Sequence, residues 1–181
     1  ISKKEVPFEM VFFGNQIQGF KANHIQLEGL KKKFYQGLWK TIKFPPLETL
    51  TGEVDLFHFT NLTNVPNRAK RNILTAHDFA FKTFPETIEP KNLKFLRDNI
   101  SSSLSRANHI ICGSEATKRD LIDFYQFPEN RITTIYNGIE EDFLRESSPV
   151  LKQKVRHKYN LNKKYLLSVS TIEPRKNYRT M

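Results

Sequence analysis

Apolar runs alternate along the chain with segments of helical spacing. The strand candidates are short and nearly continuous in apolar residues, and Gly, Pro or Asn-Gly turn signals bound several of them. Residues 91–107 instead place Leu, Ile and Ala three or four positions apart, which is typical of a helix with one apolar face. The pattern predicts strands over 8–13, 54–60, 72–78, 109–113, 131–136 and 165–170, and helices over 91–107, 115–125 and 148–159.

Continuously apolar strands that alternate with helices indicate an α/β fold, a Rossmann-like parallel sheet with helices on both faces. In such sheets ligands bind at the carboxyl ends of the strands. Three polar stretches follow predicted strands: "HD" at 77–78, "GSE" at 113–115 and "EPRKN" at 173–177. We therefore expect these stretches to line a ligand site. Ser114 also fits the N-cap of the following helix.

The net charge of +10 narrows the class of partner. Residues 151–181 hold nine Lys or Arg and one acid, and Lys31, Lys32 and Lys33 form a second basic cluster. This balance favours an anionic partner such as nucleic acid, an anionic membrane or a phosphorylated substrate, although solvated surface lysines explain it equally well. The aromatic residues stand inside apolar runs rather than among basic residues, which argues against a nucleic-acid interface.

Cysteine and histidine usage limits the metal and redox chemistry. Cys112 is the single cysteine and stands in an apolar run, so we expect a buried, unreactive thiol in a reducing compartment. The five histidines form no i, i+4 pair, and one cysteine is too few for a zinc cluster. We therefore expect no metal site and no cofactor.

The polar stretches and their flanks resemble one enzyme family. The segments are "NILTAHDFAFKTFPE" (72–86), "SLSRANHIICGSEATKRDLIDFYQFPENRITTIYNGIEEDF" (103–143) and "YLLSVSTIEPRKN" (165–177). In this order they resemble glycosyltransferase family 4, a group of retaining enzymes with the GT-B fold. The "EPRKN" variant is most similar to mannosyltransferase-type members. Residues 1–50 match no motif of that family.

The resemblance implies two Rossmann-like domains that face each other across a cleft. Residues 1–143 would be the N-terminal, acceptor-side domain, without its first strand and glycine-rich loop. Residues 144–181 would be a linker and the truncated start of the C-terminal, donor-binding domain. On this interpretation the chain is an incomplete part of a hexosyltransferase of polysaccharide biosynthesis, and we expect the part alone to be inactive.

The resemblance also assigns roles to single residues. Arg175 and Lys176 would clamp the diphosphate of a nucleotide-sugar, which is a co-substrate, and would replace a metal ion. His77 would face the donor sugar near the reacting carbon through its ring or its backbone carbonyl, and Asp78 would orient the imidazole. Alternatively, His77 and Asp78 form only a structural pair, and Arg175 and Lys176 are solvated charges. Ser114 fits a helix cap better than a ligand-binding group, although its helix begins at the expected cleft.

The expected partners follow from the same resemblance. They are a nucleotide-sugar donor and a saccharide or lipid-linked acceptor, with no nucleic acid. A cytoplasmic location is expected, and Lys31, Lys32 and Lys33 are compatible with peripheral contact with the anionic cytoplasmic face of a membrane. Three alternatives stay open: a basic nucleic-acid-binding module, a membrane-surface module, and another GT-B enzyme such as an epimerase.

Overall fold

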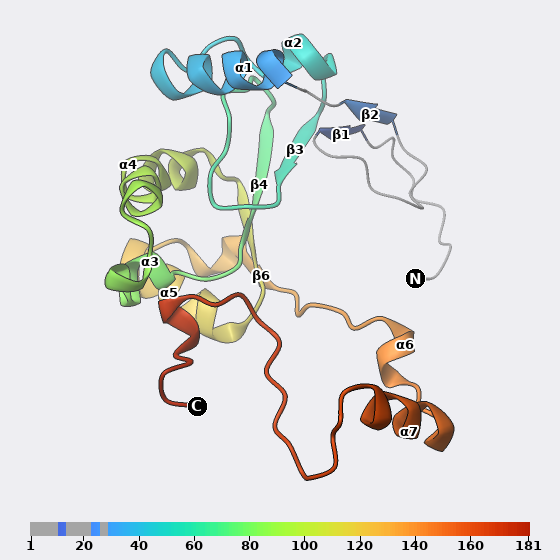
Figure 1. Ribbon diagram of the computed structural model, residues 1–181. Coiled ribbons are helices and arrows are strands. Elements are labelled where there is room, and N and C mark those ends of the chain that lie inside the picture. The colour runs from blue at the N-terminus through green and yellow to red at the C-terminus, as the bar shows by residue number, and fades with distance from the viewer. Residues whose placement is uncertain (1–10, 14–22, 26–28) are drawn as a thin grey trace.

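A four-stranded parallel sheet forms the centre of the molecule. The computed structural model describes residues 11–13, 23–25 and 29–181. The strands of this sheet lie in chain order and are all parallel (Figure 1), which confirms the predicted α/β, Rossmann-like class. They are β3 (Leu56–Phe59), β4 (Arg71–Ala76), β5 (His109–Cys112) and β6 (Ile132–Thr134). A separate parallel pair joins β1 (Val11–Phe13) and β2 (Asn23–Ile25).

The helices fall into three groups along the molecule (Figure 1). At one end lie α1 (Gly29–Thr41) and α2 (Glu48–Thr51). Beside the sheet lie α3 (Ala80–Thr83), the 3₁₀ turn η1 (Pro85–Thr87), α4 (Pro90–Arg106) and α5 (Glu115–Tyr125), followed by the 3₁₀ turn η2 (Glu129–Arg131). After β6 come α6 (Glu141–Leu144), α7 (Pro149–Lys158) and the 3₁₀ turn η3 (Pro174–Lys176).

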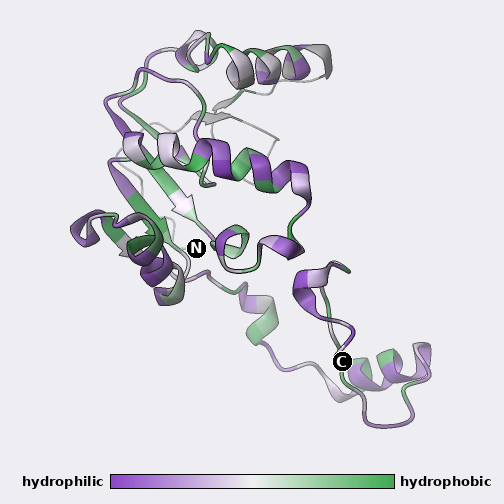
Figure 2. Ribbon diagram, turned by 90° about the vertical axis from the view of Figure 1, so that its left-hand side faces the viewer, coloured by the Kyte–Doolittle hydropathy of each residue, from purple (hydrophilic) through white to green (hydrophobic). Residues whose placement is uncertain are grey.

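One face of the sheet holds the apolar core. Alternate residues of β4 and β5 are fully buried there: Leu74, Ala76, Ile110 and Cys112. They belong to one cluster with side chains of α4 and α5, among them Leu104 and Leu121. Successive right-handed crossovers in one direction place both helices on the same face. Figure 2 shows the resulting alternation of hydrophilic and hydrophobic positions along α4.

The opposite face of the sheet is more polar and only partly buried among the described residues. Its side chains include His58 and Thr75, which share a hydrogen bond of 2.9 Å, and His109 and Thr133, which share one of 2.8 Å. Burial lowers the pKa of His58 below its ordinary value. The sequence predicts helices on both faces of the sheet. Among the described residues, α4 and α5 cover only the face that holds the apolar core.

The predicted strand over 165–170 is wrong. These residues form no strand, and Leu166, Leu167 and Val169 are 77–102% exposed. A strand requires a neighbour that completes its backbone hydrogen bonds, and no other described segment pairs with this one. Arg175 and Lys176, which follow this segment, lie in the single 3₁₀ turn η3. Of the predicted strand over 8–13, residues 11–13 form β1, and residues 8–10 lie outside the described part.

The other predicted elements are confirmed with small changes at their ends. The strand predicted over 72–78 stops at Ala76, so His77 and Asp78 lie just beyond it. The helices predicted over 91–107, 115–125 and 148–159 correspond to α4, α5 and α7. The sequence pattern did not predict β2, α1 or α2.

The thiol of Cys112 is buried at the end of β5, as its apolar run predicts. Burial and the nearby charge of Glu115 raise its pKa to about 11. Because the thiolate is the reactive form, we expect the folded protein not to react with a disulfide reagent such as dithionitrobenzoate at pH 8. The same protein in denaturant should release one equivalent of thionitrobenzoate. Stoichiometric labelling of the folded protein within minutes would contradict this burial.

Candidate functional site

Two of the predicted polar stretches meet at the carboxyl edge of the sheet. His77 and Asp78 follow β4, and Gly113 and Ser114 follow the neighbouring strand β5. The amide of Gly113 donates a hydrogen bond of 3.2 Å to the carbonyl of Ala76, which extends the strand pairing to the first residue of the loop. The two loops therefore begin side by side, as parallel pairing of their strands requires.

A chain of hydrogen bonds ties the start of α5 to His77. Ser114 is the N-cap of α5, because its Oγ accepts a hydrogen bond of 3.1 Å from the amide of Thr117. The hydroxyl of Thr117 donates to the backbone carbonyl of His77 at 3.0 Å. Since this uses the single hydroxyl hydrogen of Thr117, Ser114 is the donor in the 3.0 Å contact between the two hydroxyls. Thr117 is buried, so water does not compete for these bonds.

The imidazole of His77 is exposed at the site, and it is hydrogen-bonded to the loop that follows a third strand, β3. Its Nε2 lies 3.0 Å from the backbone carbonyl of Thr60, which follows β3. A carbonyl oxygen only accepts hydrogen bonds, so Nε2 donates in this contact. In the neutral ring, Nδ1 is then the acceptor nitrogen, and it is left for a ligand.

Asp78 contacts groups other than its neighbour His77. Its Oδ1 accepts a hydrogen bond of 3.0 Å from the amide of Ala80, at the start of α3. Its Oδ2 lies 3.6 Å from Nη1 of Arg175. Neither oxygen bonds the imidazole, so the geometry offers no hydrogen bond by which Asp78 could orient His77.

The third predicted stretch reaches the same edge from far along the chain. Residues after α7 return to the corner formed by α3 and α5 (Figure 1), where Arg175 faces Asp78. Arg175 also forms an ion pair of 2.9 Å with Glu173. Lys176 is exposed, and its ammonium group has no hydrogen bond or ion pair with any described residue. The structure thus brings His77, Asp78, Ser114 and Arg175 to one corner and leaves Lys176 with an uncompensated charge.

A small pocket of about 160 Å³ lies in this corner. Its volume is below the roughly 300–1,000 Å³ of typical small-molecule sites, so it accounts for only part of a ligand. Sequence reasoning missed most of its lining, because these residues lie on separate loops and helices and all but Phe81 stand outside the stretches that carry the resemblance. Beside His77 and Asp78, the lining consists of Asn61, Leu62, Phe81, Ile88 and Leu96.

None of the helices in the described part of the chain is long and apolar enough to cross a membrane. Nor do three His, Cys, Asp or Glu side chains of the described part come together in a way that could hold a metal ion.

Comparison with protein families gives a match over most of the chain. The model of the family described as Glycosyltransferase Family 4 matches residues 23–143. The motifs that carry the resemblance start at residue 72, but the family match starts at residue 23. The match therefore includes much of the segment 1–50, which carries no recognisable motif.

Comparison with curated proteins gives two relatives from Escherichia coli. One is an O-antigen chain mannosyltransferase B, 30% identical over 125 residues, which are 68% of this chain and 32% of that protein. The other is the serotype-specific mannosyltransferase WbdA, 30% identical over 80 residues, which are 44% of this chain and 10% of that protein. The chain therefore spans about a third or less of the length of these relatives.

The contribution of the Thr117 hydroxyl to stability can be tested by substitution. In the variant Thr117→Val, the carbonyl of His77 loses the hydroxyl partner that the buried Thr117 supplies. We expect a loss of about 1–3 kcal/mol in the free energy of unfolding, measured by urea titration. Thr117→Ser is the matched control, because it keeps the hydroxyl and loses one methyl group. Equal stability of the Val and Ser variants would show that the hydroxyl contributes nothing.

Proposed function

Because this chain belongs to glycosyltransferase family 4, we propose that the full-length protein transfers a hexose from a nucleotide-diphosphate-sugar to a saccharide or lipid-linked acceptor. The names of the two E. coli relatives, both mannosyltransferases, support mannose as that hexose. They also favour sugar transfer over epimerisation, the other GT-B activity considered. A nucleic-acid-binding function has no comparable support.

The observation that carries this proposal is the position of Arg175 opposite Asp78. Residues 97 positions apart in sequence lie 3.6 Å apart, across the corner where β4 and β5 end. The arrangement places a cationic turn beside an exposed imidazole, with the N-terminus of α5 at the same edge. The cationic turn and the helix N-terminus suit an anionic diphosphate, and the imidazole suits the sugar attached to it.

The cationic turn has the charge needed by the leaving group. When the bond between the sugar carbon and the phosphate oxygen breaks, negative charge develops on the diphosphate. Arg175 is already paired with Glu173 and Asp78, whereas Lys176 has no carboxylate partner among the described residues. In our proposal Lys176 therefore supplies the uncompensated positive charge, and Arg175 exchanges a carboxylate for a phosphate oxygen. Neither step requires a divalent ion.

His77 has two groups that could act at the reacting carbon. Its Nδ1 is left to accept a hydrogen bond from a sugar hydroxyl while Nε2 donates to Thr60. Its carbonyl already accepts one hydrogen bond from Thr117, and the second lone pair of the oxygen is left for a positively charged transition state. We propose that His77 positions the sugar ring by one or both of these contacts.

We also propose that residues 144–181 belong to a linker and the beginning of a second, donor-binding domain. The family match ends at residue 143, and the apolar residues Leu166, Leu167 and Val169 are exposed. Apolar side chains in a strand-like sequence are expected to pair with further strands. The small share of the relatives' length that the chain covers supports the same division.

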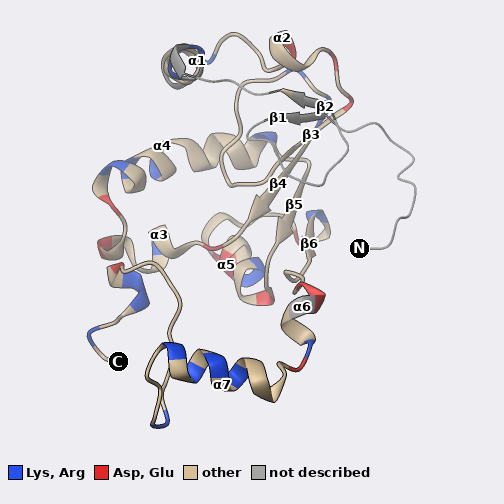
Figure 3. Ribbon diagram, turned by 45° about the vertical axis from the view of Figure 1, so that its right-hand side comes forward, with Lys and Arg blue, Asp and Glu red and all other residues tan. Residues whose placement is uncertain are grey.

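Peripheral contact with an anionic membrane is a further part of the proposal. Lys31 and Lys33 are exposed on α1, next to Phe34, which is 63% exposed. This helix lies at one end of the molecule (Figure 1), and basic and aromatic side chains on one helix suit the surface of an anionic bilayer. A second basic segment lies on α7 (Figure 3).

The role of His77 is tested by His77→Ala in the full-length enzyme. Its ring bonds only the carbonyl of Thr60 at the exposed edge, so its loss should change stability little. Loss of a contact made in the transition state should reduce kcat about 100-fold or more, measured as release of nucleoside diphosphate from a nucleotide-diphosphate-mannose. Near-normal turnover would leave His77 with a structural role alone.

The role of Lys176 is tested by Lys176→Ala, also in the full-length enzyme. We expect the affinity for the nucleotide-diphosphate-mannose to fall about 10- to 100-fold, because a charge-assisted contact with the diphosphate is lost. The difference should shrink as salt is added, since Lys176 is exposed.

Lys158→Ala is the matched control for that substitution, because Lys158 lies at the exposed end of α7. We expect the control to bind the donor like the wild type, and chelation of divalent ions to leave turnover of all three proteins unchanged. Unaltered affinity and turnover of Lys176→Ala would contradict the diphosphate clamp.

A further inference from the structure

Residues 136–139, between β6 and α6, form no hydrogen bond with any described residue. The last bond to the sheet runs from the amide of Ile135 to the carbonyl of Cys112 at 2.9 Å, and the next backbone bond joins the amide of Phe143 to the carbonyl of Glu140 at 3.0 Å. In Figure 1 the segment runs alone from the end of β6 to α6. No hydrogen bond within the described part therefore restrains the dihedral angles of these residues.

This segment contains the pair Asn137-Gly138, and an Asn-Gly pair usually indicates a tight turn. The hairpin turn that favours this pair needs positive φ at both residues. Neither Asn137 nor Gly138 has positive φ, and neither lies in a turn. Both are exposed, and their neighbours Tyr136 and Ile139 are 67% and 68% exposed. The fold therefore does not use the pair as a turn.

An exposed Asn-Gly pair has a reaction of its own. The backbone nitrogen of the second residue attacks Cγ of the asparagine, and a new N–C bond closes a succinimide ring. The side-chain nitrogen leaves as ammonia and takes the proton of the attacking amide. Water then adds to either carbonyl of the ring and opens it, which gives aspartate or isoaspartate. The sequence of steps uses water alone and needs no oxidant, reductant or metal.

We propose that Asn137 is a site of spontaneous deamidation and that the amide of Gly138 closes the ring. Gly138 has no Cβ to obstruct the approach of its nitrogen to the neighbouring Cγ. Its amide has no hydrogen-bond acceptor among the described residues, and the carboxamide of Asn137 has no partner there either. Because both residues are exposed, water can open the ring once it has formed.

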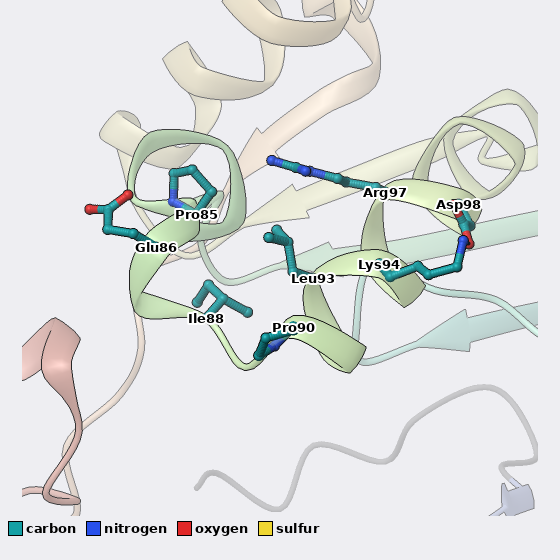
Figure 4. A pocket seen from close by; sticks show the side chains of 8 residues that line it. All are labelled: Pro85, Glu86, Ile88, Pro90, Leu93, Lys94, Arg97 and Asp98. Atoms are coloured by element: carbon teal, nitrogen blue, oxygen red, sulfur yellow. The ribbon is translucent and has the colours of Figure 1, made fainter.

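The other asparagines of the chain lack this combination, because none of them is followed by glycine. Asn92 lies in α4 between Pro90 and Leu93, which Figure 4 labels, and a helical hydrogen bond of 2.9 Å holds the amide of Leu93. Asn162 is exposed, but it is followed by Lys163, whose side chain obstructs ring closure. The structure thus selects one asparagine for this modification.

Deamidation changes both the length and the charge of the connection between the sheet and α6. Isoaspartate carries the main chain through the former side chain, which adds one bond between Asn137 and Gly138. Either product adds a carboxylate near the exposed Glu140 and Glu141. Molecules that have reacted therefore form a more acidic population with an altered connection. The reaction does not depend on the proposed sugar transfer.

The test is peptide mapping of the full-length protein during incubation for several days at pH 8. Trypsin releases residues 132–145 as one peptide. We expect this peptide to gain the mass that replaces an amide nitrogen by oxygen, and an isoaspartyl methyltransferase to methylate it. Conversion should be slower at pH 6, because the deprotonated amide is the attacking form. The tryptic peptide 159–163, which contains Asn162, is the internal control and should not change.

Gly138→Ala is the matched control, because a Cβ at this position meets no atom within 4 Å and the variant should fold normally. We expect conversion to slow about tenfold or more, since the Cβ narrows the backbone angles at which the nitrogen reaches Cγ. Asn137→Gln is a second variant and should not react measurably, because its longer side chain must close a larger ring. Equal thermal unfolding midpoints will show that all comparisons concern the folded protein.

The synthetic peptide 132–145 separates the effect of the fold from that of the sequence. Conversion of the folded protein at a rate close to that of the peptide supports the proposal. Conversion of the peptide without conversion of the folded protein overturns it, because the fold would then protect Asn137. Aspartate without isoaspartate overturns the ring route, and equal rates in wild type and Gly138→Ala overturn the role of Gly138.

Discussion

The hydrogen bonds from Ser114 through Thr117 to the carbonyl of His77 hold the site together. They connect the N-terminus of α5 to the loop after β4, which are separate in the chain and adjacent only because β4 and β5 pair in parallel. Since Thr117 is buried, each bond is stronger than it would be in water, and loss of one leaves a polar group unpaired. This connection fixes the backbone of His77 beside the N-terminus of α5, while the carbonyl of Thr60 holds the ring and Asp78 bonds the first amide of α3.

Much of the fold could be predicted because its signals are local. Continuous apolar runs between amphipathic helices indicate parallel strands, and parallel strands place the residues that follow them at one edge. This reasoning was sufficient for His77, Asp78 and Ser114. It failed for residues 165–170, because strand propensity does not ensure a pairing partner. Apart from the strand over 8–13, it predicted no element in residues 1–50, where the family match begins without a short recognisable motif.

Such patterns could not predict contacts between loops that are far apart in the sequence. Nothing in the spacing of Asp78 and Arg175 indicates that they lie 3.6 Å apart. Asn61 and Leu62 line the corner only because the loop after β3 passes beside the end of β4. Thr117 resembles any residue of the first turn of a helix, and its role depends on which carbonyl lies beside it.

The order of the strands has a consequence for how the chain folds. In the four-stranded sheet each strand pairs with the next one in sequence, so every pairing closes a loop through a single connection. Loop closure of this kind costs less entropy than pairing between strands farther apart in the chain. The unit from β3 to β6 can thus assemble progressively as it leaves the ribosome. The corner would then already be shaped when Arg175, synthesised after β6, comes to meet it.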